Sequence, residues 1–91
     1  MPKKPKPERT NEEIRAIVRA AFAPLGCVAE IWDYEKKLRV RVFDMKGHPV
    51  VRIPEMMLRT LQDDRELRKM IFSVRGEVEA KGFHLDPWEL K

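Results

Sequence analysis

The side chains that could support covalent catalysis in this sequence are a single cysteine, Cys27, and two histidines, His48 and His84. A cysteine beside a histidine can act as a nucleophile that is activated by a base. The pattern around Cys27 indicates an inward-facing strand position, whereas the histidines fall in a predicted turn and in the C-terminal tail. Nothing in their spacing brings the three together, so we expect a buried, unreactive thiol rather than a Cys-His catalytic site.

Other chemistries are excluded by residue counts and spacing. One cysteine cannot form an internal disulfide, and together with two histidines it offers no zinc-ligand spacing. The 4 glycines are isolated, so the sequence has no glycine-rich phosphate loop. The neighbouring carboxylates Asp63 and Asp64 are better explained as the cap of a helix. We therefore expect a protein that is not an enzyme and that binds no metal or cofactor.

The composition indicates one small folded domain with a basic N-terminal arm. The 91 residues are 43% hydrophobic and 37% charged, with a formal net charge of +4, and this length accommodates a single core. Most of the excess charge lies in residues 1–10, where prolines disfavour a helix and predict a flexible, solvated arm. The cations of this arm are Lys3, Lys4, Lys6 and Arg9. No apolar run approaches the roughly 20 residues of a membrane span, and the start does not resemble a signal peptide, so we expect a cytoplasmic protein.

Helical periodicity predicts one helix before the strands and a short one after them. Residues 10–13 have the form of a capping box, and Pro24 cannot continue the helix that they open. The apolar stripe of this helix is Ile14, Ile17, Val18, Ala21 and Phe22. Residues 54–61 indicate a short helical turn that begins at or near its proline and is anchored by Leu58 and Leu61.

The longest predicted helix opens with acidic residues at 63–66 and stops at Gly82. Its buried stripe is Leu67, Met70, Ile71, Val74 and Val78. The tail, residues 84–91, contains Trp88 and Leu90, which would otherwise be left in water. We therefore expect the tail to fold back on a single domain that spans residues 11–83.

A period of two predicts antiparallel strands over residues 27–33 and 38–43. Asp33 and Leu38 are taken to flank the turn between them. In that register the inner pairs are Ile31 with Val40 and Ala29 with Val42. The outer pairs are Trp32 with Arg39, Glu30 with Arg41 and Val28 with Phe43.

A third strand is predicted through Val51 and Ile53. Simple alternation would place Val51 opposite Val40, whereas a bulge at Gly47 would shift the pairing by one residue. The sequence leaves both registers open. The predicted fold class is α+β, with a helix, a three-stranded antiparallel sheet, a short helix and a long helix, and with the helices packed on one face of the sheet.

Several passages resemble a family of small bacterial proteins known only as a domain of unknown function. The resemblance rests on residues 13–27, on the strand 38–44 and on Gly47, and it spans roughly residues 12 to 80. Its most specific passage is Ala-Phe-Ala-Pro-Leu-Gly-Cys at residues 21–27, and the sequence departs from the pattern at residues 54–57. The resemblance implies a fold and no activity, so it supplies no functional residues.

The face of the sheet away from the helices is the first candidate site. Its predicted residues are Val28, Trp32, Tyr34, Arg39, Arg41, Phe43, Val50 and Arg52, with Glu30 among them. A bare sheet face with aromatic side chains is typical of a protein interface, of a surface covered by the chain's own tail, or of a nucleic-acid platform. We expect a non-catalytic binding module that acts through self-association, as a homodimer, or through a protein partner at this face.

The outer side of the longest helix is the second candidate site. Its residues are Arg65, Arg68, Lys69 and Arg75, clustered around Phe72. A basic face with an aromatic residue suits phosphate contact and stacking, so the alternative function is nucleic-acid binding by this face and the arm. The element order is similar to that of double-stranded-RNA-binding domains, in topology alone. The alternative without a ligand is a solvated helix face on which Phe72 is covered by the short helix or the tail.

Overall fold

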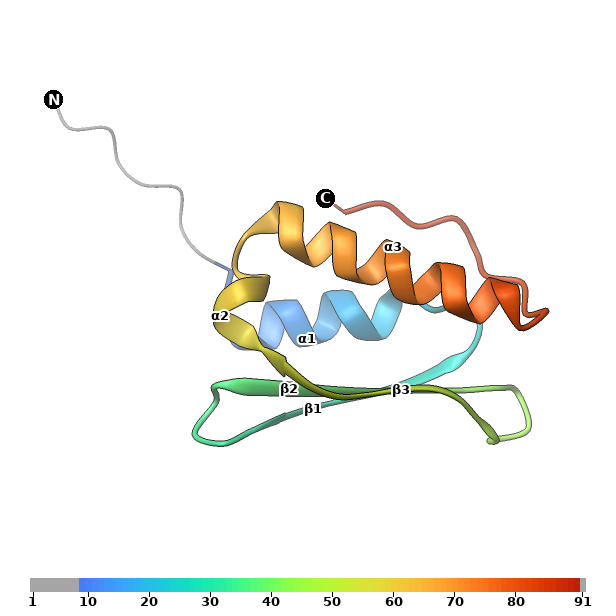
Figure 1. Cartoon of the computed structure of the whole chain (residues 1–91), viewed down its shortest axis with the longest axis horizontal. Helices are drawn as coiled ribbons and strands as arrows, with labels where there is room; N and C mark the ends of the chain where they lie inside the picture. Colours follow the sequence, from blue (N-terminus) through green and yellow to red (C-terminus); the bar gives the residue numbers. More distant parts are fainter. Residues whose placement is uncertain (1–8, 91) are drawn as a thin grey trace, which may run out of the picture.

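The fold is a three-stranded antiparallel sheet with helices on one face (Figure 1). The computed structural model describes residues 9–90, so the lysines of the expected arm lie outside the described residues. The elements follow in the order α1 (Asn11–Ala20), β1 (Gly26–Trp32), β2 (Lys37–Phe43), β3 (Pro49–Met57), α2 (Leu58–Leu61) and α3 (Asp64–Ala80). The strand order is β1-β2-β3, and the arrangement confirms the predicted α+β class.

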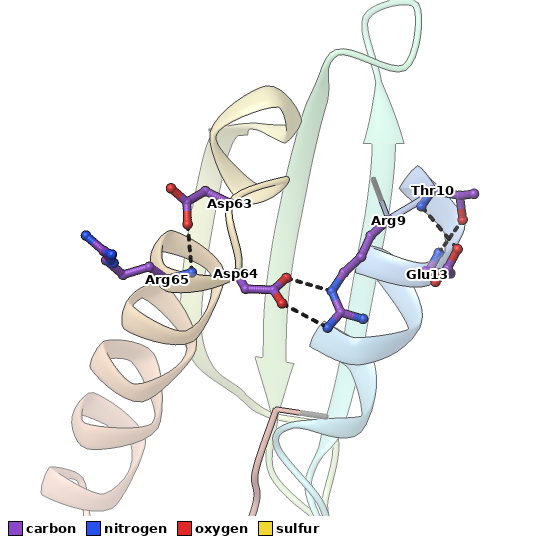
Figure 2. Close-up of polar contacts among 6 residues, drawn as sticks. All are labelled: Arg9, Thr10, Glu13, Asp63, Asp64 and Arg65. Carbon is purple, nitrogen blue, oxygen red and sulfur yellow. Dashed lines mark hydrogen bonds and ion pairs between the residues drawn. The ribbon is translucent and has the colours of Figure 1, made fainter. Parts of the chain in front are cut away.

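Both long helices begin with the predicted caps, and an ion pair joins the two beginnings (Figure 2). The Thr10 hydroxyl accepts from the Glu13 N–H at 3.1 Å, and the Glu13 carboxylate accepts from the Thr10 N–H at 3.2 Å. Asp63 caps α3 by accepting from a first-turn amide at 2.8 Å. The Arg9 guanidinium donates to both carboxylate oxygens of Asp64, at 2.8 and 3.3 Å. The sequence predicts Arg9 in a solvated arm, but in the structure Arg9 fastens the start of α1 to the start of α3.

The core lies between the inner face of the sheet and the helices. Alternate residues of β2 are fully buried, as the period of two predicts: Leu38, Val40 and Val42. The helices bury Ile14, Val18, Leu58, Leu61, Leu67, Ile71, Val74 and Val78 in the same cluster, which confirms most of both predicted stripes. Ile17 and Met70 are half-buried at its margin. Each large apolar side chain buried here contributes about 1.5 to 3 kcal/mol, so this layer is the main stabilising feature of the fold.

The register between β1 and β2 differs from the predicted register by two residues. Ile31 lies opposite Leu38 rather than Val40. The turn occupies residues 33–36, of which the first three have left-handed φ angles between 53° and 63°, so it begins one residue earlier than predicted. A shift of two residues keeps every strand side chain on its face of the sheet, and the predicted inner and outer sides are therefore correct.

The strand β3 is longer and less regular than the sequence predicts. It continues to Met57, so Pro54 lies inside the strand instead of starting a helix. Two bulges interrupt its pairing with β2, with Val50 as the extra residue of the first and Pro54 within the second. An edge strand tolerates proline at a bulge because the missing N–H is not needed there. The pairing places Val51 opposite Val42 and not opposite Val40.

The C-terminal segment folds back over the helices, away from the sheet (Figure 1). Leu85 is buried, and the half-buried ring of Trp88 packs edge-on against Phe72 with 5.4 Å between the ring centroids. The Asp86 N–H donates to the Ala23 carbonyl at 2.8 Å, which ties the segment to the loop after α1. One prediction for the bare sheet face is that the chain's own tail covers it. Residues 84–90 lie against the helices instead, so they do not cover that face.

Candidate binding surface on the open sheet face

The sheet face that points away from the helices carries aromatic, cationic and acidic side chains. We call it the open sheet face, and its residues are Val28, Glu30 and Trp32 of β1, Lys37, Arg39, Arg41 and Phe43 of β2, and Arg52 and Glu55 of β3. These residues alternate along the strands with the buried inner residues, which fixes their direction. No segment within residues 9–90 lies across this face in Figure 1, and Trp32 keeps 37% of its surface exposed.

Cations lie against both aromatic rings of this face. Lys37 Nζ is 5.0 Å and Arg39 Cζ is 5.1 Å from the centroid of the Trp32 ring. Arg41 Cζ is 5.9 Å from the centroid of the Phe43 ring. Contacts of this kind contribute about 0.5 to 1 kcal/mol each at exposed sites. The predicted contact between Trp32 and Arg39 exists, but as a diagonal pair, because the register is shifted by two residues.

Two of the cations on this face have carboxylate partners. Arg41 Nη2 lies 2.5 Å from Glu30 Oε1, the partner that the sequence predicts. Lys37 Nζ lies 2.5 Å from Glu55 and 3.5 Å from Asp33, and the hydrogen bond to Glu55 raises the pKa of Lys37. Lys37 is not among the predicted residues, although an extension of the alternation by one residue includes it. Glu55 is not among them either, because it follows a bulge that no sequence pattern indicates.

Arg39 and Arg52 make no ion pair with any residue that the structure describes. Together with Arg41, Phe43 and Pro49 they line a cleft of about 390 Å³. The Nε atoms of Arg39 and Arg41 are shielded from solvent without a hydrogen-bond partner in the described part of the chain. A shielded atom is out of reach of a ligand, so the cleft offers a ligand only those guanidinium donors that stay open to solvent.

Two residues predicted for this surface lie elsewhere. Val50 is buried in the core cluster, because as the extra residue of a bulge it does not follow the alternation of the strand. Its carbonyl accepts from Lys81 Nζ at 2.6 Å. Tyr34 is 92% exposed in the turn between β1 and β2, where left-handed φ angles at residues 33–35 end the alternation of β1. Val28, Trp32, Arg39, Arg41, Phe43 and Arg52 are the predicted residues that the sheet does bring together.

The predicted basic face of α3 is smaller than expected, because Arg75 is not part of it. Arg75 is 8% exposed, and its guanidinium donates to the Ala21 carbonyl at 2.5 Å and to the Asp86 carbonyl at 2.7 Å. It lies at the margin of the buried stripe, where a long side chain reaches polar groups beneath the tail. Phe72 is 49% exposed but packs against Trp88. The cations of this face that stay exposed are Arg65, Arg68 and Lys69.

The thiol and the histidines are separate features. Burial raises the pKa of the Cys27 thiol to about 11, and its Sγ lies 3.9 Å from the Val18 carbonyl. A thiol with this pKa is almost entirely protonated at neutral pH, which makes it a poor nucleophile. His48 is exposed, with Nδ1 3.6 Å from an Asp44 carboxylate oxygen, and His84 is exposed in the tail. No hydrogen bond among the described residues joins either histidine to Cys27.

The part of the chain that the structure describes contains no cluster of three His, Cys, Asp or Glu side chains arranged to hold a metal ion. In residues 9–90 there is also no helix with the length and apolar character needed to cross a membrane.

The fold and its surface define a class of small α+β proteins in which helices cover one face of a three-stranded sheet and the other face is cationic and aromatic. Residues 12–78 match the family described as "Protein of unknown function (DUF1652)". The match covers most of the chain, so the protein belongs to this family, and the resemblance found in the sequence is confirmed. Neither the curated proteins nor the solved structures contain a match to the chain.

Proposed function

We propose that this protein is a small, non-catalytic binding module of the bacterial cytoplasm, and that its open sheet face binds an acidic segment of a protein partner. The observation that carries this proposal is the position of Arg39 and Arg52. Both guanidinium groups line the cleft of the open sheet face without a carboxylate partner among the described residues. A ligand with carboxylates would supply the missing acceptors.

An acidic peptide suits the cleft in geometry as well as in charge. A guanidinium group presents its donors in a planar fork that matches the two oxygens of a carboxylate. Arg39 is held against the Trp32 ring and Arg41 against the Phe43 ring, which reduces the side-chain entropy that binding would cost. The exposed part of Trp32 adds apolar surface beside the cations, a combination typical of protein interfaces.

The charge of the face distinguishes an acidic partner from a second copy of the chain. The face holds the cations Lys37, Arg39, Arg41 and Arg52 and the carboxylates Glu30 and Glu55, with Asp33 of the adjoining turn 3.5 Å from Lys37. Two copies stacked face to face would therefore oppose like charges, and like charges in a desolvated contact are costly. Between the two occupants expected from the sequence, the charge favours a protein partner over self-association at this face.

Nucleic acid is the second candidate ligand, because phosphates also bind unpaired arginines and sheet aromatics can stack on bases. Two features of the face weigh against it. Glu30 and Glu55 would lie near the phosphates, and cations already lie over the ring of Trp32. The alternative site on α3 keeps Arg65, Arg68 and Lys69 but has lost Arg75 to internal hydrogen bonds.

The test compares two double charge reversals that change the net charge equally. Arg39→Glu with Arg52→Glu alters the open sheet face, and Arg65→Glu with Arg68→Glu alters the exposed side of α3. The probes are a fluorescein-labelled Glu-rich peptide of about ten residues and a single-stranded oligonucleotide of similar charge, followed by fluorescence anisotropy at low salt, where charge contacts are strongest. The sheet variant should bind the peptide at least about tenfold more weakly, and the α3 variant should bind it like the wild type.

Before binding is compared, circular dichroism and thermal unfolding are used to check that both variants are folded. An equal loss of peptide binding in the two variants would mean attraction by net charge alone and would contradict the proposal. Binding of the oligonucleotide in preference to the peptide, with loss in either variant, would establish the nucleic-acid alternative and locate its site. Absence of peptide binding by the wild type would also overturn the proposal.

A further inference from the structure

The strand β1 is a sheet edge without the usual protection. All seven of its residues pair with β2 without a bulge. On the other side it has no backbone hydrogen-bond partner within residues 9–90. The strand contains no proline, and its only charged residue is Glu30. Natural edge strands are normally protected by prolines, bulges or several charges, because a regular free edge pairs with another strand.

The opposite edge of the same sheet shows what this protection looks like. β3 carries Pro49 and Pro54, which have no N–H to donate, and bulges break its ladder in two places. The contrast within one sheet indicates that the regular edge of β1 is used for pairing.

The inner-facing side chains of β1 are covered less completely than those of β2. Cys27 and Ile31 point toward the inner face but are only half-buried. Their partners across the ladder on β2, Val42 and Leu38, are fully buried. Apolar side chains at the open side of an otherwise closed core gain free energy when a further strand covers them.

We propose that two copies of this chain pair through their β1 strands, antiparallel and about a two-fold axis at Ala29, to form one six-stranded sheet. Ala29 is the central residue of the strand, so this register pairs the whole of Gly26–Trp32 with itself. Antiparallel pairing about a two-fold axis is the usual geometry of a symmetric dimer that forms through one surface. The proposal concerns the sheet edge, so it is independent of the ligand of the open sheet face.

The register at Ala29 is complementary on both faces of the sheet. On the inner face, Cys27 lies opposite the partner's Ile31, which continues the apolar layer. On the outer face, Val28 lies opposite the partner's Glu30, so the two Glu30 carboxylates are not opposed. Gly26 lies opposite the partner's Trp32, whose ring can cover a position where an added Cβ would meet only Phe43, at 3.9 Å.

The neighbouring registers that keep the same faces are worse. A dyad at Glu30 places the two Glu30 carboxylates directly opposite each other and leaves only residues 28–32 paired. A dyad at Val28 pairs only residues 26–30 and places Trp32 opposite the partner's Pro24, which cannot donate to the ladder. The Ala29 register is therefore the one in which the strand is complementary to itself.

The charge at position 28 tests both the dimer and its register. In the proposed dimer, Val28→Glu places a carboxylate opposite the partner's Glu30 at two symmetric positions, and Val28→Lys places a cation there. Within one copy, position 28 lies opposite Arg41 of β2, so the same substitutions have opposite effects on the fold. Val28→Glu should favour the monomer fold and weaken the dimer, whereas Val28→Lys should do the reverse.

The measurement is size-exclusion chromatography with light scattering on the full chain, at concentrations from about 5 to 500 µM. The wild type should shift from 10.8 kDa toward twice that mass as its concentration rises. Each like-charged cross-strand contact changes an equilibrium constant by about 1.4- to 5-fold, so Val28→Glu should raise the dissociation constant about 2- to 30-fold. Val28→Lys should lower it, because it places a cation opposite the partner's Glu30. A wild type that stays monomeric throughout this range would overturn the proposal.

A dimer that is insensitive to the charge at position 28, but is broken or strengthened by Arg39→Glu with Arg52→Glu, would also overturn it, by locating association on the open sheet face. As a check on register, chains with Val28→Cys and chains with Glu30→Cys, both in a Cys27→Ala background, are mixed and oxidised. The mixture should form more intermolecular disulfide than either variant alone, because positions 28 and 30 face each other only across the dyad at Ala29. Equal yields in all three samples would contradict this register.

Discussion

Replacement of Arg75 by alanine should weaken both the fold and the attachment of the C-terminal segment. The Arg75 guanidinium donates to the Ala21 carbonyl after α1 and to the Asp86 carbonyl in the tail. It therefore joins three parts of the chain that are far apart in sequence. The same region holds the hydrogen bond from the Asp86 N–H to the Ala23 carbonyl, so loss of Arg75 should loosen that contact too.

The magnitude follows from the environment of this side chain. A hydrogen bond donated by a charged group stabilises a fold by about 1.5 to 3 kcal/mol, so the two bonds together contribute about 3 to 6 kcal/mol. The cost of burying the guanidinium opposes this, because Arg75 is 8% exposed and forms no salt bridge with a residue in the described range. We expect a net loss of about 2 to 4 kcal/mol from a typical domain stability of about 5 to 15 kcal/mol. The melting temperature should fall by about 4 to 8 °C for each kcal/mol.

Urea unfolding followed by circular dichroism measures this loss, and Arg68→Ala is the matched control. Arg68 is exposed on the same helix, so its removal should change stability by no more than about 0.5 kcal/mol. In a Trp32→Phe background the fluorescence of Trp88 reports on the tail, and its emission should shift to longer wavelength in Arg75→Ala. Equal stability of the two alanine variants, or an unchanged Trp88 spectrum, would refute the assignment of Arg75 as an internal anchor.

Three further predictions concern the core, the thiol and the second turn. Ile71→Ala removes a fully buried side chain and should cost about 2 to 5 kcal/mol in urea unfolding; a loss below about 1 kcal/mol would contradict its central position. Because burial raises the pKa of Cys27 to about 11, alkylation by iodoacetamide at pH 8 should be slow in the native protein and fast in urea, and equal rates would show an accessible thiol. The Asp44 carboxylate accepts hydrogen bonds from the backbone N–H groups of His48 and Lys46, which lower its pKa below the ordinary 3.8. The ionised carboxylate therefore stabilises the fold above pH 3.8, and this contribution disappears as the pH falls through the lowered pKa. The stability difference between the wild type and Asp44→Ala should therefore shrink on acidification from pH 7 to below the lowered pKa, and a constant difference would be inconsistent with the hydrogen bonds at Asp44.

Features with a local physical cause could be predicted from the sequence. The capping box at Thr10 depends on residues within one helical turn, and the alternation of residues 38–42 depends on which face of one strand is buried. The faces of β1 and β2 were predicted correctly for the same reason, and so were the side chains of the open sheet face within these two strands, apart from Lys37 at the start of β2. The family resemblance also rests on a contiguous passage, residues 21–27.

Features that depend on distant parts of the chain could not be predicted. The first turn begins at Asp33 with consecutive left-handed residues, although their residue types do not require that conformation. Pro54 fits a helix start or a strand bulge equally well, and pairing with β2 decides between them. Arg75 lies at the margin of the helical stripe, and only the positions of the loop after α1 and of the tail make carbonyl acceptors available to it. The two hydrogen bonds of Arg75 depend on the tertiary structure, and so does the absence of a carboxylate partner for Arg39 and Arg52 among the described residues.

The prolines and bulges of β3 have a consequence for how large an assembly can become. A sheet with two regular edges can add copies at both ends and grow without limit into a fibre. In this sheet Pro49 and Pro54 interrupt the donors of one edge, and the bulges change its spacing. Growth by strand addition is therefore confined to β1, and a strand that pairs with its own copy consumes the edge that a third copy would need. The irregular strand thus makes the assembly finite, and it protects a chain with one open edge from polymerisation at high concentration.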